Sequence, residues 1–143
     1  KVLDNSRLDV AATALGIAEA ALAAAVQWTH ERQVAGEPLA MRQGIQWMLA
    51  DMKLRLEASW ALTQQALALR EAGQPFTLQS ALAKLHASEM AGFVADAALQ
   101  IHGGYGYTRA LPLERYVRDA RILRIYEGSS EIQRTIIARA VLG

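Results

Sequence analysis

The chain has 143 residues, no cysteine and a formal net charge of +1, and 52% of its residues are hydrophobic. This length is typical of one domain, and the balanced charge gives no long-range attraction to nucleic acid or anionic membranes. The lack of cysteine excludes disulfides, thiolate metal sites and cysteine nucleophiles.

Alanine and leucine dominate the apolar residues, and only three prolines occur, which favours a helical bundle over a sheet protein. No continuous apolar run reaches the roughly 18 residues of a membrane-spanning helix, and no signal peptide is visible, so no membrane span is expected. The sequence begins with Lys1 rather than methionine, and we therefore expect a piece of a longer protein.

Apolar residues recur at helical spacing in three long stretches and predict three long helices. The first runs from about Ser6 to about Gln33, the second from about residue 45 to 72, and the third from about residue 77 to 101. The glycines and prolines that end the first two helices are Gly36, Pro38, Gly73 and Pro75.

Two shorter helices are predicted after the third. Pro112 suits the first turn of a helix whose apolar face ends at Leu123, and a final helix follows Gly128. Ser130 and Gln133 are typical of a capping box at the start of this last helix. Short connections imply that neighbouring helices run antiparallel. The predicted fold class is therefore all-α, an antiparallel up-down helical bundle of three long helices plus two shorter C-terminal helices.

Most apolar stripes are interpreted as core, and Trp28, Trp47 and Trp60 as packing anchors. The three histidines are scattered without the spacing of metal ligands, so no metal site is expected. From residue 109 to 139, seven arginines alternate with four acids, which is typical of paired, solvated faces. A nucleic-acid groove is therefore not expected.

Two features at predicted helix ends allow a structural or a ligand-binding interpretation. A plain helix C-cap needs one glycine, whereas residues 103–106 contain three, as expected where something approaches the backbone closely. Arg32, at the end of the first helix, either neutralises the helix dipole or reaches an anionic ligand. The residues alone leave the glycine cluster open and favour the dipole for Arg32.

Glu127 lies between an apolar run and Gly128, where the last predicted helix starts. It follows Leu123 by four residues and so continues the apolar face of the preceding helix. A carboxylate on an apolar face loses hydration, which suits it to act as a base. If the chain turns away at Tyr126, Glu127 meets water instead, and the residues alone do not decide between the two.

Several motifs follow one another in a fixed order along the chain. They are Leu3–Leu8, Glu31-Arg32 with Gly36 and Pro38, Gln43–Gln46, Gln100–Tyr107, Glu114–Tyr116, Arg118–Arg121 and Ile125–Gly128. Together they resemble the C-terminal helical domain of acyl-CoA dehydrogenases, over nearly the whole chain. Enzymes of this family use FAD to oxidise the α–β bond of an acyl-CoA thioester to a trans-2-enoyl-CoA. The resemblance implies that residues 1–143 form this domain, without the family's N-terminal helical and middle β-domains, and that this chain alone turns over little or no substrate.

The resemblance implies a role for each matching residue. Glu127 matches the catalytic base that removes the α-proton; its backbone N–H would bind the thioester carbonyl, and Gly128 would keep the turn narrow beside the substrate. Some subfamilies carry the base on the first helix, but the matching residue here is Ser6, which leaves Glu127 without a rival. The residues that match FAD contacts are Arg32, Gln43, Gln100, Gly103, Gly104, Ser129 and Glu131, and those that match positions near the acyl-CoA are Asp4 and Arg7.

The resemblance also implies FAD as cofactor, an acyl-CoA as substrate and an electron-transfer flavoprotein or similar acceptor as partner. Because Arg32 and Gln43 match contacts that often reach the FAD of a neighbouring subunit, a homo-oligomer is expected, either a dimer or a dimer of dimers (homotetramer). The expected setting is fatty acid metabolism in a bacterial cytoplasm or the mitochondrial matrix. Ala35 and Glu37 replace a phenylalanine and a basic residue that are common in the family, which is expected to weaken or reshape flavin contacts.

Two alternatives stay open. An acyl-CoA oxidase or a related flavoenzyme uses the same scaffold but shields its reduced flavin less well from oxygen. A non-catalytic helical module would only mediate oligomerisation, although Glu127, the glycine cluster and Arg32 argue against it.

Overall fold

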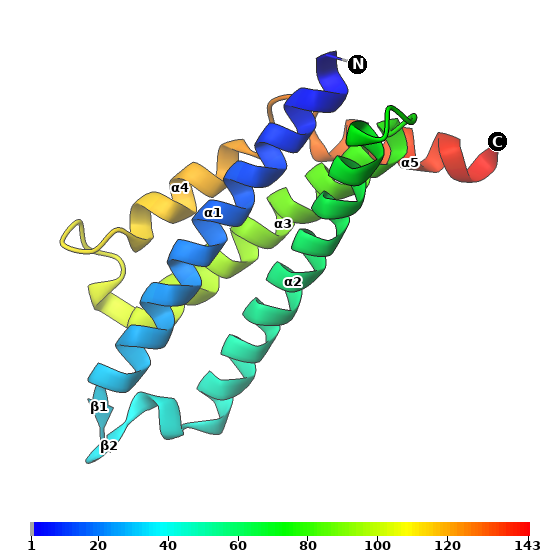
Figure 1. The fold of residues 1–143 in the computed structure, drawn as a ribbon. Helices are drawn as coiled ribbons and strands as arrows, with labels where there is room; N and C mark the ends of the chain where they lie inside the picture. The colour runs from blue at the N-terminus through cyan, green and yellow to red at the C-terminus, as the bar shows by residue number, and fades with distance from the viewer. Residues whose placement is uncertain (1) are drawn as a thin grey trace.

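The computed structural model describes residues 2–143, and the five α-helices among them confirm the predicted all-α fold class. Three long helices lie side by side, and two shorter ones follow (Figure 1). Their bounds are α1 (Val2–Glu31), α2 (Gln43–Glu71), α3 (Thr77–His102), α4 (Leu113–Ile122) and α5 (Ser130–Leu142). Successive long helices run in opposite directions, as predicted for an up-down bundle.

α3 is the central helix and packs against α1, α2, α4 and α5. Along α1 and α3, fully buried alanines repeat every three or four residues, so that they share one face of each helix. These residues are Ala11, Ala14, Ala18, Ala21 and Ala25 in α1 and Ala83, Ala87, Ala91, Ala95 and Ala98 in α3. Small side chains let helix axes approach closely, which makes the α1–α3 contact the most extensive in the bundle.

The connection between α1 and α2 contains a β-hairpin that the sequence pattern did not predict. β1 (Gln33–Val34) pairs antiparallel with β2 (Glu37–Pro38). The two turn residues, Ala35 and Gly36, have φ of 53° and 83°, and a two-residue hairpin turn of this kind requires positive φ at both positions. Because alanine rarely adopts positive φ, the sequence carries no hairpin signal here. A short 3-10 helix, η1 (Leu39–Met41), leads into α2.

α1 is more apolar on average than its uninterrupted apolar runs suggest, although no membrane span was expected from those runs. Among residues 2–143 it is the one helix that would qualify by length and composition alone, with a mean hydropathy of 1.6 over an 18-residue window. The expectation rested on uninterrupted apolar runs, whereas many alanines and few charges raise the mean over a longer window. The buried stripe of α1 packs against α3 and α2, as expected of a core helix in a bundle.

The tryptophans differ in burial. Trp47 is 64% exposed on α2, so its predicted role as a packing anchor within this chain is wrong. Trp60 is half-buried, and its indole donates a hydrogen bond to Glu19 Oε1 at 2.8 Å, which links α2 to α1. Trp28 is also half-buried and faces the second site described below.

Candidate functional site

The turn between α4 and α5 lies at the end of the bundle where α1 begins (Figure 1). α4 ends at Ile122, whose carbonyl accepts hydrogen bonds from the backbone N–H groups of Ile125 and Tyr126 at 2.9 and 3.2 Å. Glu127 and Gly128 then have positive φ of 54° and 88°, which turns the chain away from the axis of α4. Glu127 is exposed. Of the two alternatives that the sequence left open, the structure shows the second: the chain turns away before Glu127, which therefore does not continue the apolar face of α4.

Ser6, near the start of α1, contacts the Glu127 carboxylate. Its hydroxyl donates a hydrogen bond to Glu127 Oε2 at 2.7 Å, although 121 positions separate the two residues. The two residues that the resemblance matches to alternative positions of a base are therefore neighbours in space, and their roles stay predictions. A serine hydroxyl donates to a carboxylate but does not replace it as a base, so this pair consists of one carboxylate and one group that orients it.

Two fully buried side chains hold the carbonyl of Gly128. Lys84 Nζ donates to this oxygen at 2.7 Å and Gln133 Nε2 at 2.9 Å. Burial lowers the pKa of Lys84, and the positive charge of Arg7 adds to this effect, whereas three nearby glutamates oppose it. The sequence-based prediction missed Lys84. The available signal was a lysine within the alanine-rich stripe of α3.

The predicted capping box at the start of α5 is not formed. Ser130 is the first residue of the helix, and its hydroxyl donates to Glu89 Oε1 at 2.7 Å. The Gln133 side chain bonds the Gly128 carbonyl instead. In a capping box the two side chains bond backbone N–H groups within the first helical turn. Here Ser130 bonds a residue of α3 and Gln133 bonds the turn before α5, so neither side chain caps the helix.

The backbone conformation of Gly128 and the nearby Gln133 side chain favour a glycine at this position. Its φ is 88°, and a Cβ at this position would lie 2.5 Å from Gln133 Nε2. A side chain here would be strained by the positive φ and would displace the Gln133 amide. The glycine thus allows Gln133 to reach the turn, and its predicted contact with substrate stays a prediction.

Four further predicted site residues lie at the same end of the bundle. Arg7 Nη1 contacts Asp4 Oδ1 at 2.8 Å, and both side chains are buried. The exposed Thr77 at the start of α3 donates from Oγ1 to Asp4 Oδ2 at 3.2 Å. Ser129 and Glu131 line a pocket of about 320 Å³ beside the turn. A hydrogen bond from the Ser129 side chain lowers the pKa of Glu131, which favours its charged form.

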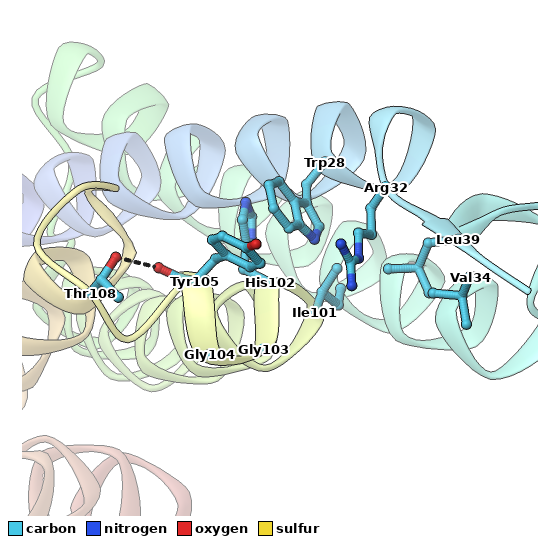
Figure 2. A pocket seen from close by; sticks show the side chains of 10 residues that line it. All are labelled: Trp28, Arg32, Val34, Leu39, Ile101, His102, Gly103, Gly104, Tyr105 and Thr108. Carbon is cyan, nitrogen blue, oxygen red and sulfur yellow. Dashed lines mark hydrogen bonds between the residues drawn. The ribbon is translucent and has the colours of Figure 1, made fainter.

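A second pocket, of about 470 Å³, lies where α1 and α3 end; we call it the glycine pocket (Figure 2). The Trp28 and His102 rings stack with centroids 5.0 Å apart, and Tyr105 lies 5.4 Å from Trp28. The Arg32 guanidinium lies 5.9 Å from the centre of the Tyr105 ring. The residues that line the pocket are Trp28, Arg32, Val34, Leu39, Ile101, His102, Gly103, Gly104, Tyr105 and Thr108.

The three glycines after α3 are present for different reasons. Gly103 has a φ of 60°, and a Cβ on Gly106 would lie 2.8 Å from both Leu99 O and His102 Cβ, so the chain itself requires these two glycines. A Cβ on Gly104 would meet nothing within 4 Å. Gly104 therefore leaves space in the lining of the glycine pocket that the fold of this chain does not need.

The structure brings together some of the predicted FAD contacts and not others. Arg32, Gly103 and Gly104 share the glycine pocket, whereas Gln43 and Gln100 do not line it. Gln43 is the first residue of α2, and Gln100 is exposed on the last turn of α3. Their cofactor roles stay predictions.

The aromatic wall of the glycine pocket was missed from the sequence. Trp28 precedes Arg32 by four residues, and this spacing was the available signal that both face the same side. His102 Nδ1 contacts the Ala98 carbonyl at 2.7 Å. Within residues 2–143 no group of three or more His, Asp or Glu side chains is placed to hold a metal ion.

The two sites lie at opposite ends of α1. Ser6 contacts Glu127 near the first turn, whereas Arg32 directly follows the last residue, Glu31. Ser6 and Glu31 are 25 positions apart, which corresponds to about 38 Å along the helix at about 1.5 Å per residue. Glu127 and Arg32 of one chain are therefore too far apart to meet at one reacting centre.

Comparisons with known proteins agree over the whole chain. A family model described as "Acyl-CoA dehydrogenase, C-terminal domain" matches residues 1–142. Acryloyl-CoA reductase (NADH) of Anaerotignum propionicum is 53% identical over 142 residues, which cover 99% of this chain and 36% of that protein. The mitochondrial short-chain specific acyl-CoA dehydrogenase of Rattus norvegicus is 50% identical over 142 residues, covering 99% of this chain and 34% of that protein.

Solved structures show the same similarity. Butyryl-CoA dehydrogenase from Megasphaera elsdenii matches with a TM-score of 0.97 and 47% identity, over 99% of this chain and 37% of that one. A chain in a structure described as the electron transferring flavoprotein of Acidaminococcus fermentans matches with a TM-score of 0.97 and 46% identity, over 98% of this chain and 37% of that one. The present chain thus spans about a third of the length of its relatives.

Proposed function

Since the chain belongs to the acyl-CoA dehydrogenase family, by its match to the C-terminal domain, we propose that the protein containing it oxidises an acyl-CoA thioester to the trans-2-enoyl-CoA with FAD as cofactor. The observation that carries this proposal is the exposed Glu127 carboxylate, presented on a left-handed turn and oriented by Ser6. Relatives named short-chain and butyryl-CoA dehydrogenases support a short-chain substrate and a place in fatty acid metabolism.

In this proposal Glu127 is the base. It takes the proton from the α-carbon, whose acidity is raised by the neighbouring thioester carbonyl. Ser6 bonds Oε2, which leaves Oε1 to face the substrate. The backbone N–H of Glu127 donates to the thioester oxygen and stabilises the enolate-like charge that develops as the proton leaves.

The described residues fit FAD. Arg32 offers a cation for a phosphate group, and the open space at Gly104 lets a ligand approach the backbone. Trp28 and Tyr105 offer flat surfaces to a ring system. Gln43, Gln100 and Gly103 extend these contacts, and Ser129 and Glu131 contact FAD at the other end of the bundle. FAD, when bound, supplies the acceptor for the hydride that leaves the β-carbon.

The separation of the two sites supports a site shared between subunits. Because Arg32 lies about 38 Å along α1 from the residue that contacts Glu127, the glycine pocket serves the FAD beside the Glu127 of a neighbouring subunit. The protein is accordingly a homo-oligomer, a dimer or a dimer of dimers.

N-terminal helical and middle β-domains complete the protein and exclude water from Glu127, and Asp4 and Arg7 lie near the acyl-CoA. The present chain alone binds FAD weakly and turns over little substrate.

Alanine substitutions at Gly104 and at Gly106 are expected to have different effects: the first weakens FAD binding, and the second lowers the stability of the fold. In Gly104→Ala the new methyl meets no atom of the chain, so stability is kept while the Kd for FAD rises about tenfold, or about 1.4 kcal/mol. In Gly106→Ala it lies 2.8 Å from Leu99 O, which is expected to destabilise the protein by about 1–3 kcal/mol. Fluorescence titration with FAD and urea unfolding of the full-length apoprotein measure the two effects. An unchanged Kd in Gly104→Ala would remove this residue from cofactor binding.

Anaerobic titration of the full-length, FAD-loaded protein with acyl-CoA thioesters of increasing chain length tests the proposed function. We expect butyryl-CoA to bleach the flavin absorbance and long-chain thioesters to bleach it less. Failure of every thioester to bleach the flavin overturns the proposal. Peroxide formed in equal amount with the enoyl product in air favours an oxidase, and protein that takes up no FAD favours an oligomerisation module.

The reverse reaction is a second candidate, because the relative that is 53% identical is named acryloyl-CoA reductase (NADH). The same residues serve either direction, since Glu127 would return the proton to the α-carbon. Faster reoxidation of the reduced flavin by acryloyl-CoA than bleaching by propionyl-CoA favours the reductase.

An electron-transfer flavoprotein or a similar acceptor is the proposed redox partner. A structure that contains a similar chain is described as such a flavoprotein, which supports this choice. Bacterial and mitochondrial relatives support a bacterial cytoplasm or the mitochondrial matrix as the compartment.

A further inference from the structure

We propose that Lys84 is a positioning residue for the reaction proposed above: from the buried side of the turn it holds the Gly128 carbonyl and so keeps Glu127 directed toward the substrate. This inference rests on the proposed function of Glu127. Lys84 lies on α3, 43 positions before Glu127 in the sequence, and does not reach the open side of the turn.

The Gly128 carbonyl has as many hydrogen-bond donors as it can accept. The Gly128 oxygen accepts one hydrogen bond from Lys84 Nζ at 2.7 Å and one from Gln133 Nε2 at 2.9 Å. A carbonyl oxygen has two lone pairs, so these two donors fill its capacity. Both side chains have no exposed surface. The Lys84 bond is therefore shielded from water, where a charged donor binds more strongly than a neutral one.

The turn needs these donors because its backbone is unfavourable by itself. Glu127 has a φ of 54° and is followed by Gly128 at 88°. The left-handed region is unfavourable for a residue with a Cβ, and such conformations persist only where surrounding contacts hold them in place. Gln133 Nε2 also lies 3.4 Å from the Glu127 carbonyl, and the Ser130 N–H donates to the Arg124 carbonyl across the turn at 3.0 Å. Without Lys84, these bonds remain but the Gly128 carbonyl keeps only one of its two donors.

Burying the Lys84 ammonium group is energetically unfavourable, so a role in packing alone does not explain a lysine at this position. A lysine in an alanine-rich stripe loses its hydration, and its pKa is lowered by burial and by the charge of Arg7. An apolar side chain of similar length, such as methionine, would fill the same space without this penalty. What the lysine adds over methionine is the charged hydrogen bond to the turn that carries Glu127.

Three variants of the full-length, FAD-loaded protein test the role of Lys84. Lys84→Met removes the donor and is expected to lower the rate of flavin reduction by butyryl-CoA about 10- to 100-fold, while KM changes less than about threefold and FAD stays bound. Lys84→Arg keeps the charge and is expected to recover part of this loss. Ser88→Ala, one turn further along α3 and bonded only to the Leu85 carbonyl, is the control and is expected to retain the wild-type rate.

The outcomes are distinguishable. Wild-type reduction rates in Lys84→Met, or an equal loss in Ser88→Ala, overturn the role of Lys84 and leave the proposed function intact. If Lys84→Met does not fold, Lys84→Gln is measured instead. Its amide is neutral and shorter, so it weakens the hydrogen bond to the Gly128 carbonyl while keeping a polar group in the same place. A wild-type rate in Lys84→Gln also overturns the proposal. If the wild-type protein itself is not bleached by any acyl-CoA, the proposed function fails, and the role of Lys84 fails with it.

Discussion

Glu127→Gln in the full-length, FAD-loaded protein is expected to lower the rate of flavin reduction by butyryl-CoA about 10³- to 10⁴-fold, while FAD remains bound. Glutamine has nearly the shape of glutamate, and its amide oxygen still accepts the hydrogen bond that Ser6 donates to Oε2. It cannot, however, take up the α-proton, and general-base catalysis typically contributes factors of this size. Stopped-flow absorbance under anaerobic conditions measures the reduction rate, and the visible flavin spectrum before mixing reports FAD occupancy.

The matched control is Glu57→Gln, which removes a carboxylate from the exposed face of α2, where Glu57 pairs with Lys53. This variant is expected to keep the wild-type reduction rate. A wild-type rate in Glu127→Gln would show that another group removes the proton. A low rate accompanied by loss of FAD would show that Glu127 acts through the cofactor site rather than as a base.

Arg32→Glu is expected to raise the Kd for FAD about 100-fold and to leave the Glu127 turn unchanged. The substitution replaces an exposed cation in the lining of the glycine pocket by an anion, which loses a charge-assisted contact with phosphate and adds repulsion. Fluorescence titration of the full-length apoprotein with FAD measures the change. Arg70→Glu, at the far end of α2 and exposed, is the control for charge reversal and is expected to leave the Kd unchanged.

The same variant decides whether one site is shared by two subunits. Co-expression of Arg32→Glu with Glu127→Gln, followed by purification through a different tag on each chain, yields hybrid oligomers. If Arg32 serves the FAD of a neighbour, half of the hybrid sites combine an intact Glu127 from one chain with an intact Arg32 from the other. We then expect up to about half of the wild-type activity, well above either parent variant. No gain over the parents would mean that Arg32 does not act on the flavin of a neighbour.

Local patterns predicted the long helices well. α2 and α3 start and end close to the positions predicted from apolar spacing and from Gly73 and Pro75, because spacing and helix-breaking residues act within a few turns of the chain. α1 begins at Val2, four residues before the predicted start at Ser6. The hairpin after α1 was missed because Ala35, a residue without turn preference, takes a φ of 53°.

The roles of the candidate site residues stay predictions, but the structure shows surroundings of these residues that the sequence did not reveal. The sequence left open whether Glu127 faces an apolar site or water, and the structure exposes it because Glu127 and Gly128 turn the chain away from the axis of α4 through positive φ. The expected capping box failed because Ser130 bonds Glu89, 41 positions away. The glycine cluster was only partly explained, since the chain itself requires Gly103 and Gly106 but not Gly104.

The sequence by itself determined the helices, the all-α class, the family and the carboxylate of interest, because these follow from local spacing and from motifs a few residues long. Only the tertiary structure decided what surrounds Glu127. Ser6 comes from α1 and Lys84 from α3, at separations of 121 and 43 positions from Glu127. Such contacts depend on how these two helices pack through their alanine faces, and no local pattern encodes which side chains that packing brings to the turn.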